Sequence, residues 1–523
     1  MSRFNQKTLK FSFVNSRQTL STTVCLLLIF VLSVQPVTAA KNVILLIGDG
    51  MGFQAISILM TYEKAQLLSG KGRDEKGTGV FTKLMATAPT GFLKTNPLRY
   101  VVTDSAAAAT AMACGKKTLP TVLGKDGKGN PLKSVLKYAQ DMGKKTGLVS
   151  THCITDATPG GFYAQVTTRN DHHIVAQQLL ATGVDVALGG GLKYFIPASA
   201  DVAAFSADMA AAVKANGGYG GSSGRKDNLN LVEEAKLKGY KIVHNETQLS
   251  EVFLNKNDKL LGLFSPHHMS FEIDRRTLDK WQPSLDTMTE KALSTLDKHE
   301  EGFFLMVEGA SIDSAGHYND AAAILGETKA FAAAVETCLD YAKKDGDTLV
   351  IVTADHETGI PAFSYKKLRT QPAKQPFVDG DEWEQGYDSI AYDRPLVLDG
   401  QKLSFMRMFY RANRDPEKLF ADMKKYTDYE YDLDMAKIAL GKRLAPDEKV
   451  HYDDPMYEYY KANTIYFCGK IARTLTAQTG VTWATGHHGG TPVPIFAAGK
   501  GANAVRGLHD NTWIHYYIRS MLR

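Results

Sequence analysis

Short apolar segments that each lead into a carboxylate are the feature that most constrains this chain. Three of them are Val43–Ile47 before Asp49, Phe303–Val307 before Glu308, and Leu349–Val352 before Asp355. Such short, continuous apolar runs are typical of strands that are buried on both faces of a parallel sheet. Because parallel strands end at the same edge of a sheet, where open α/β folds bind ligands, we expect the three carboxylates to share one site.

The pattern between these segments predicts the fold class. A fourth apolar run, Pro494–Ala498, is expected to be another buried parallel strand, and helical spacing lies between the runs, for example at Ala321–Lys343. This alternation indicates an α/β fold with a doubly wound, mostly parallel central sheet and helices on both faces. At 523 residues, one large domain with insertions and two domains are both open.

Two stretches have the composition of insertions. Asp201–Asn257 is rich in Ala, Gly and Lys, whereas Pro361–Thr479 is longer, rich in Tyr and Phe, and contains helical spacing at Glu417–Gly441. The second stretch separates two groups of candidate site residues, so both its ends are expected near the rim of the site. A lid, a crown, a dimer arm and a surface subdomain with its own small core all remain open for it.

The N-terminal 40 residues have the pattern of a secretory signal. A basic region without acidic residues precedes the apolar run Val24–Val34, and small residues follow at Val37–Ala40. Cleavage after Ala39 or Ala40 would leave a globular chain of residues 41–523, secreted or periplasmic and without a membrane anchor; an uncleaved anchor is the alternative. Removing the four basic residues lowers the formal net charge from +5 to +1, so no basic surface is expected for nucleic acid.

Export would permit disulfides among the remaining cysteines. Beyond residue 40 these are Cys114, Cys153, Cys338 and Cys468. Four thiols allow three pairings, and spacing does not choose among them. Buried thiols with at most one bridge are the preferred interpretation.

Ser105 precedes an alanine-rich run that predicts a helix. The segment Thr103–Ala111 places Asp and Ser before strong helix formers, as at a helix N-terminus. The positive end of the helix dipole there favours both an alkoxide and a bound phosphate. An ordinary helix-capping serine is the alternative. No Gly-x-Ser-x-Gly surrounds Ser105, so a nucleophilic role would need a metal rather than a neighbouring base.

Candidate metal ligands lie in three separate segments. Asp313 and His317 are four residues apart, so one helical turn would bring both to one face. Asp355–His356 and His487–His488 supply further carboxylate and imidazole groups. Such mixed ligands without thiolate fit a catalytic zinc site better than a structural one.

These segments together resemble the alkaline phosphatase family. The resemblance runs from about Lys41 to Gly501 outside the two insertions. The segments that match family motifs are Val43–Gly52, Thr103–Ala106, Asp156–Pro159 followed by Arg169, Asp185–Phe195 and Gly262–Arg275. It implies hydrolysis of small phosphate monoesters through a phosphoserine at Ser105, with two Zn²⁺ and one Mg²⁺, in a homodimer.

The resemblance also implies a role for each site residue. The first zinc would be held by Asp313, His317 and His488, and the second by Asp49, Asp355 and His356, with Ser105 also reaching it. Magnesium would be held by Asp49, Glu308 and Thr158, with Asp156 acting through water. Arg169, oriented by Asp104, would bind two phosphate oxygens.

Some positions are resolved only by alignment or depart from the family pattern. His488 is preferred to His487 because of the following Gly489–Gly490. Ser314 stands where some family members have a basic or aromatic residue, which implies a weaker or water-mediated phosphate contact from that side. Three further histidines match no family motif and are expected to be structural: His152, His267 and His268.

Two other functions compete with monoester hydrolysis. The same fold could hydrolyse phosphodiesters or sulfate esters, against which the third metal set and Arg169 argue. The chain could instead bind metal or phosphate without turnover, against which the complete set of catalytic positions argues.

Overall fold

The computed structural model describes most of the chain beyond the predicted signal segment. The described residues are 39–522, without 72–75, 216–220, 365, 368–372, 377–381, 386, 389–390, 414 and 441–461. The signal predicted at residues 1–40 therefore lies outside the described residues, except for Ala39 and Ala40. Residues Ala39–Arg523 form one compact unit by their internal contacts.

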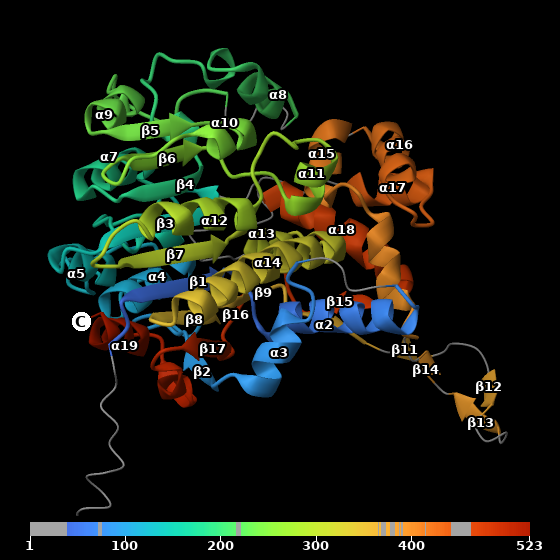
Figure 1. Ribbon diagram of the computed structural model, residues 1–523. Coiled ribbons are helices and arrows are strands. Elements are labelled where there is room, and N and C mark those ends of the chain that lie inside the picture. The colour runs from blue at the N-terminus through green and yellow to red at the C-terminus, as the bar shows by residue number, and fades with distance from the viewer. Residues whose placement is uncertain are drawn as a thin grey trace, which may run out of the picture. The chain divides into compact units, whose positions relative to one another are not determined.

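A ten-stranded sheet forms the centre of this unit (Figure 1). The strands follow one another in the order β18 (Gly507–Asp510), β2 (Thr90–Lys94), β17 (Val493–Gly499), β8 (Thr348–Ala354), β1 (Asn42–Gly48), β7 (Phe303–Gly309), β3 (Lys145–Cys153), β4 (Val186–Gly190), β6 (Lys259–Leu263) and β5 (Tyr240–Val243). All neighbouring pairs are parallel except those of β17, which runs antiparallel to both β8 and β2. The predicted mostly parallel α/β sheet is confirmed, but the expectation that Pro494–Ala498 is a parallel strand is wrong.

The register of the three central strands aligns the predicted carboxylates. Gly48 at the end of β1 pairs with Gly309 of β7 and Ala354 of β8. Asp49 and Asp355 therefore leave the sheet from the same edge, and Glu308 is the last residue but one of β7. All residues of β1, β7 and β8 are buried, which explains why their sequences are continuous apolar runs.

Helices pack on both faces of the sheet (Figure 1). On one face lie α12 (Leu285–Leu296) and α14 (Ala321–Asp345); on the other lie α4 (Ser105–Cys114), α5 (Val135–Asp141), α6 (Ala157–Gly160) and α19 (Trp513–Met521). The predicted helix Ala321–Lys343 is thus α14. It begins after Asp320, whose side chain accepts from Ala323 N, and it ends at Gly346, whose φ is 74°.

The other helices connect the strands. Those in the first two thirds of the chain are α2 (Phe53–Leu68), α3 (Val80–Thr87), α7 (His172–Thr182), α8 (Ala207–Ala215), α9 (Leu231–Leu237), α10 (Glu246–Glu251), α11 (Glu272–Thr277) and α13 (Ser311–His317). The predicted insertion 201–257 contains α8, α9 and α10, but it also supplies the edge strand β5. It therefore extends the central sheet as well as projecting from it.

The long predicted insertion is mostly helical in its described part. It contains a 3₁₀ segment η3 (Arg394–Gly400), then α15 (Phe405–Ala412), α16 (Pro416–Tyr426), α17 (Leu433–Leu440) and α18 (Ala462–Thr479). The short strands before, in and after it are β9 (Glu357–Thr358), β10 (Pro361–Phe363), β11 (Lys366–Lys367), β12 (Ala373–Pro376), β13 (Glu382–Gln385), β14 (Tyr387–Asp388), β15 (Val481–Trp483) and β16 (His488–Gly489). The helical spacing at Glu417–Gly441 becomes two helices, α16 and α17.

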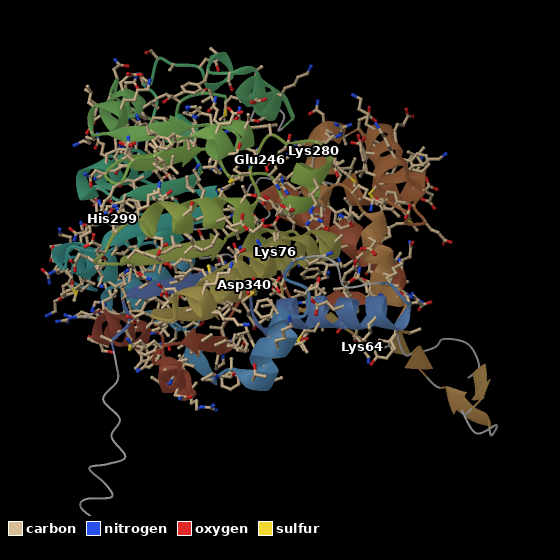
Figure 2. All side chains as sticks on the ribbon, viewed as in Figure 1. Lys64, Lys76, Glu246, Lys280, His299 and Asp340 are labelled. Atoms are coloured by element: carbon tan, nitrogen blue, oxygen red, sulfur yellow. The ribbon has the colours of Figure 1, made fainter. Side chains whose placement is uncertain are left out.

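Many charged side chains lie at the surface of the described chain, whereas buried apolar side chains form its core. Figure 2 shows charged side chains such as Lys64, Lys280 and Asp340 at the surface, where all three are exposed.

The four cysteines are buried and unpaired in the described structure, which agrees with the preferred interpretation of buried thiols. Among the described residues, no helix combines the length and the hydropathy needed to cross a membrane.

Candidate active site and metal centres

Ser105 begins α4 at the edge of the sheet where β1 and β8 end. The helix cap is Asp104, whose Oδ1 accepts from Ala107 N at 3.1 Å. The capping interpretation of Ser105 is therefore wrong, and its hydroxyl is available for other contacts. Ser105 is 2% exposed, and its Oγ lies 3.2 Å from His356 Nε2. The dipole of a buried ten-residue helix adds positive potential at this hydroxyl.

The first ligand group beside Ser105 consists of Asp49, Asp355 and His356. His356 Nε2 lies 3.5 Å from Asp49 Oδ1 and 3.2 Å from Asp355 Oδ2. The Thr358 hydroxyl lies 3.3 Å from His356 Nδ1 and donates to Asp313, so it accepts from Nδ1–H. This tautomer directs the lone pair of Nε2 toward the two carboxylates.

The second ligand group consists of Asp313, His317 and His488. His317 Nε2 is 3.4 Å from Asp313 Oδ2 and 3.1 Å from His488 Nε2, and His488 Nε2 is 3.4 Å from Asp313 Oδ1. The Nδ1 atoms of His317 and His488 face the carbonyls of Gly486 and Thr103 at 2.7 and 2.8 Å. Both rings therefore present Nε2 to the centre of the group.

The donor sets and their spacing fit divalent metal ions. Ligand atoms about 2.0–2.1 Å from a tetrahedral zinc lie about 3.3 Å from one another, close to the spacing in both groups. Asp49 Oδ1 and Asp355 Oδ2 are buried and accept no hydrogen bond from the described residues. Buried carboxylate oxygens without donors are costly unless a cation is bound, so the first group fits a metal ion.

The electrostatics of the two ligand groups also favour a bound cation. Burial, together with repulsion from Asp355, Asp313 and Glu308, raises the pKa of Asp49 well above its usual value. Burial and Asp313 raise the pKa of Asp355 to about 7. In the second group burial opposes the charged forms, yet the partnership with Asp313 raises the pKa of His488 to about 9. Several negative charges thus converge where a cation would compensate them.

The hydroxyl of Thr158 lies between the carboxylates of Asp49 and Glu308 and bonds both. The Thr158 hydroxyl donates to Asp49 Oδ2 at 3.3 Å, and the Ser150 hydroxyl donates to Glu308 Oε2 at 2.5 Å. Burial raises the pKa of Glu308. Hard oxygen ligands of this kind suit magnesium.

Asp156 contacts different residues. Its Oδ1 accepts from Ala157 N at 2.8 Å and from Arg169 Nη2 at 2.9 Å, while Oδ2 lies 2.9 Å from His152 Nδ1. The structure thus brings Asp156 into contact with Arg169 and His152. Among the described residues, Asp156 is grouped with His152 and His268 and not with either of the two ligand groups above.

Arg169 is held beside Ser105 by two carboxylates. Its guanidinium pairs with Asp156 and lies 3.7 Å, at Nη1, from Asp104 Oδ2. Asp104 is itself fixed, because its Oδ2 accepts from Thr121 N at 2.9 Å and its Oδ1 caps α4. One residue therefore orients the start of the helix that carries Ser105 and also contacts Arg169.

The sequence did not reveal the contact of His152 with this site, and only alignment favoured His488 over His487. His152 was expected to be structural, but it contacts Asp156 and lies 3.1 Å, at Nε2, from Ser314 Oγ. The only signal in the sequence is its position four residues before Asp156. Between the adjacent histidines, His488 joins the second ligand group, whereas the ring of His487 lies 6.3 Å from that of His317.

Comparisons with known proteins agree with this architecture. The sequence profile of the family described as "Alkaline phosphatase" matches residues 40–523. "Alkaline phosphatase 3" of Bacillus subtilis (strain 168) is 32% identical over 486 residues, which cover 91% of this chain and 87% of that protein. The alkaline phosphatase of Escherichia coli (strain K12) is 35% identical over 357 residues, 61% of this chain and 70% of its own length.

Solved structures give the same result. The crystal structure of the Thermus thermophilus alkaline phosphatase aligns with a TM-score of 0.73 at 26% identity, covering 93% of this chain and 92% of that one. A mutant of TAB5 alkaline phosphatase with Mg bound in its M3 site aligns with a TM-score of 0.57 at 26% identity, covering 93% and 99%. Given the profile match over nearly the whole described chain, the protein belongs to the alkaline phosphatase family, whose members are metal-dependent hydrolases of phosphate monoesters.

Proposed function

We propose that this alkaline phosphatase works through a covalent phosphoserine at Ser105. The Ser105 oxygen attacks phosphorus, the bond to the ester oxygen breaks, and the alcohol leaves; water then cleaves the phosphoserine and releases inorganic phosphate. The observation that carries this proposal is the position of Ser105. It is the first residue of α4, and its Oγ lies 3.2 Å from His356 Nε2. The helix dipole favours both the alkoxide and the phosphoryl group.

We also propose the metal ligands of this enzyme. One Zn²⁺ would be held by Asp313, His317 and His488, and a second Zn²⁺ by Asp49, Asp355 and His356. A Mg²⁺ would be held by Asp49, Thr158 and Glu308, with Asp156 reaching it through water. When bound, two zinc ions of this kind stabilise the attacking and leaving oxygens of an in-line displacement. Support comes from the convergent Nε2 atoms, the buried carboxylate oxygens without donors, and the Mg reported for the TAB5 mutant.

Arg169 is proposed to bind the transferred phosphoryl group. A guanidinium offers two parallel N–H donors, which match two oxygens of a phosphate dianion. A diester has a single negative charge and one fewer free oxygen, so the same arginine favours monoesters. The contacts of Arg169 with Asp156 and Asp104 hold the guanidinium near Ser105 and support this assignment.

Replacing the nucleophile tests the covalent mechanism. Ser105→Ala removes the attacking oxygen, so kcat/KM for an aryl phosphate monoester should fall by at least about a thousandfold. Ser57→Ala is the matched control, because Ser57 is exposed on α2 and its hydroxyl only bonds the Phe53 carbonyl. The rate of the wild type on the monoester is also compared with its rates on a diester and on a sulfate ester. A wild type that prefers the diester or the sulfate ester, or a Ser105→Ala variant with unimpaired activity, would contradict the proposal.

Removal of metal tests the ligand assignment. Prolonged chelation should abolish hydrolysis and lower the melting temperature, because the buried carboxylates of Asp49 and Asp355 lose their counterion. Zinc with magnesium should restore both, and zinc binding should be counted by elemental analysis of the dialysed protein. Activity that persists after the metal content has fallen to zero would contradict the assignment, whereas metal-loaded protein without turnover would favour a binding protein.

We propose in addition that the protein is exported and acts as a homodimer. Export is supported by the signal pattern of residues 1–40 and by the start of the family match at residue 40. The dimer rests on the family resemblance alone. Residues 41–523 would then be the mature enzyme, with the segments 201–257 and 361–479 as its insertions.

A further inference from the structure

We propose that His152 is a positioning residue that aims Arg169 at the phosphoryl group by fixing the carboxylate of Asp156. This inference rests on the proposed function, since it gives His152 a role through the phosphate-binding arginine. His152 is the last residue but one of β3 and is 3% exposed. It does not touch the two zinc-like ligand groups.

Both ring nitrogens of His152 are engaged. Nδ1 lies 2.9 Å from Asp156 Oδ2, and Nε2 lies 3.1 Å from the hydroxyl of Ser314, the residue after Asp313. Burial opposes ionisation of Asp156, but the Arg169 charge and the hydrogen bond from His152 hold its pKa well below the usual value. An ionised carboxylate only accepts, so Nδ1–H donates to Asp156 Oδ2, while Nε2 forms a hydrogen bond with the Ser314 hydroxyl.

The two oxygens of Asp156 contact different partners. Oδ1 receives Arg169 Nη2 at 2.9 Å and Ala157 N at 2.8 Å, while Oδ2 receives His152. With both oxygens held, the carboxylate cannot rotate about its last bond without losing a charge-assisted hydrogen bond. Arg169 Nη2 donates to Oδ1 of this carboxylate, so a rotation of the carboxylate that followed the loss of His152 would displace the guanidinium and redirect its remaining N–H groups.

The hydrogen bonding of the neighbouring His268 argues against a metal ion bound between His152, Asp156 and His268. His152, Asp156 and His268 could form a three-ligand group by distance alone. However, His268 Nδ1, the atom 3.9 Å from Asp156 Oδ2, accepts from Cys153 N at 3.2 Å. The lone pair that would face a shared ion is thus already used. The two rings instead pack against each other at a tilt of 36°, with centroids 3.9 Å apart, and this contact restricts the orientation of His152.

Two amide substitutions separate the two contacts of His152. In His152→Asn the amide nitrogen takes the place of Nδ1 and keeps the contact with Asp156, whereas in His152→Gln it takes the place of Nε2 and keeps only that with Ser314. We expect His152→Asn to bind inorganic phosphate nearly as the wild type does. His152→Gln and His152→Ala should raise the inhibition constant of phosphate and the KM of an aryl phosphate by about tenfold, with a smaller change in kcat.

A double substitution tests whether the effect passes through Arg169. In the Arg169→Ala background, His152→Gln should cause no further loss of phosphate affinity, because the residue through which it acts is gone. His515→Gln is the matched control, since His515 on α19 is also buried but bonds the carbonyl of Ala113, which lies at the end of α4 opposite to Ser105. Melting curves and metal content establish that each variant is folded and loaded.

Each outcome of these measurements decides between the proposals. Equal phosphate binding by all His152 variants, or equal losses in His152→Asn and His152→Gln, would overturn the role of His152. A loss that persists in the Arg169→Ala background would overturn the path through Arg169. Failure of the proposed function itself has a different signature: Arg169→Ala alone would leave phosphate binding unchanged, or Ser105→Ala would remain active.

Discussion

The residues around Ser105 are arranged at a cost to the fold of the metal-free protein. Asp49 and Asp355 are buried beside each other, and each retains an oxygen without a hydrogen-bond donor among the described residues. Burial and the neighbouring carboxylates raise the pKa of both. Groups that destabilise a fold by their placement are typical of functional sites, because the ligand compensates them.

Asp355 allows this cost to be measured. The pKa of Asp355 in the folded protein is about 7, above the usual 3.8. The free energy of unfolding of the metal-free protein should therefore fall as the pH rises from about 4 to 7, and the whole destabilisation by the Asp355 charge is present above pH 7. Asp355→Asn removes that charge, while its Oδ1 can still accept from Gly50 N and His356 N. Metal-free Asp355→Asn should therefore melt about 2 °C or more above the metal-free wild type at pH 8.

The same substitution should reverse its effect when metal is present. Zinc should stabilise the wild type at pH 8 but raise the melting temperature of Asp355→Asn far less, since an amide is a weak zinc ligand. The advantage of the metal-free variant should vanish at pH 4, where the wild-type carboxylate is protonated. A metal-free Asp355→Asn that melts below the wild type at pH 8 would contradict the electrostatic account.

Sequence patterns predicted the gathering of site residues because the sheet itself aligns them. Asp49, Glu308 and Asp355 follow from three buried strands, and Asp313 and His317 from one helical turn. The capping residue could not be chosen in this way, since Asp104 and Ser105 are both good caps and only backbone geometry distinguishes them. His152 was hidden for a similar reason: a histidine near a strand end has no periodic signal that reveals its partners.

At the scale of elements, buried strands are easier to predict than their direction. The neighbouring strands β8, β1 and β7 have sequences of continuous apolar residues, and so does β17, whose first five residues are buried. It nevertheless runs antiparallel to β8 and β2. Burial on both faces determines composition, whereas direction depends on how the preceding segment returns to the sheet. The edge strand β5 was missed for the opposite reason, because Tyr240–Val243 is short and only partly buried.

At the scale of the whole molecule, the long insertion is joined to the catalytic core by buried polar contacts. Ser404 donates to Asp274 from both its backbone and its hydroxyl, each at 2.7 Å, and Phe405 N donates to Asp320, the cap of α14, at 2.7 Å. Arg407 Nη2 lies 2.6 Å from Asp279 Oδ2. Helix α15 is therefore anchored to α11 and α14, and the described part of the insertion is expected to unfold together with the core.

Two arginines of α15 test this anchoring. Arg407 is 2% exposed and pairs across to the core, so Arg407→Ala leaves Asp274 and Asp279 buried without their cation and should cost about 3–5 kcal/mol. Arg411 pairs with Asp422 inside the insertion and is more exposed, so Arg411→Ala should cost about 1 kcal/mol or less. Denaturant unfolding followed by fluorescence should show one transition in the wild type and both variants. If Arg407→Ala instead released an early transition while the core unfolded at its original midpoint, the insertion would be a separately folding unit, and a mobile lid over the active site would become the better description.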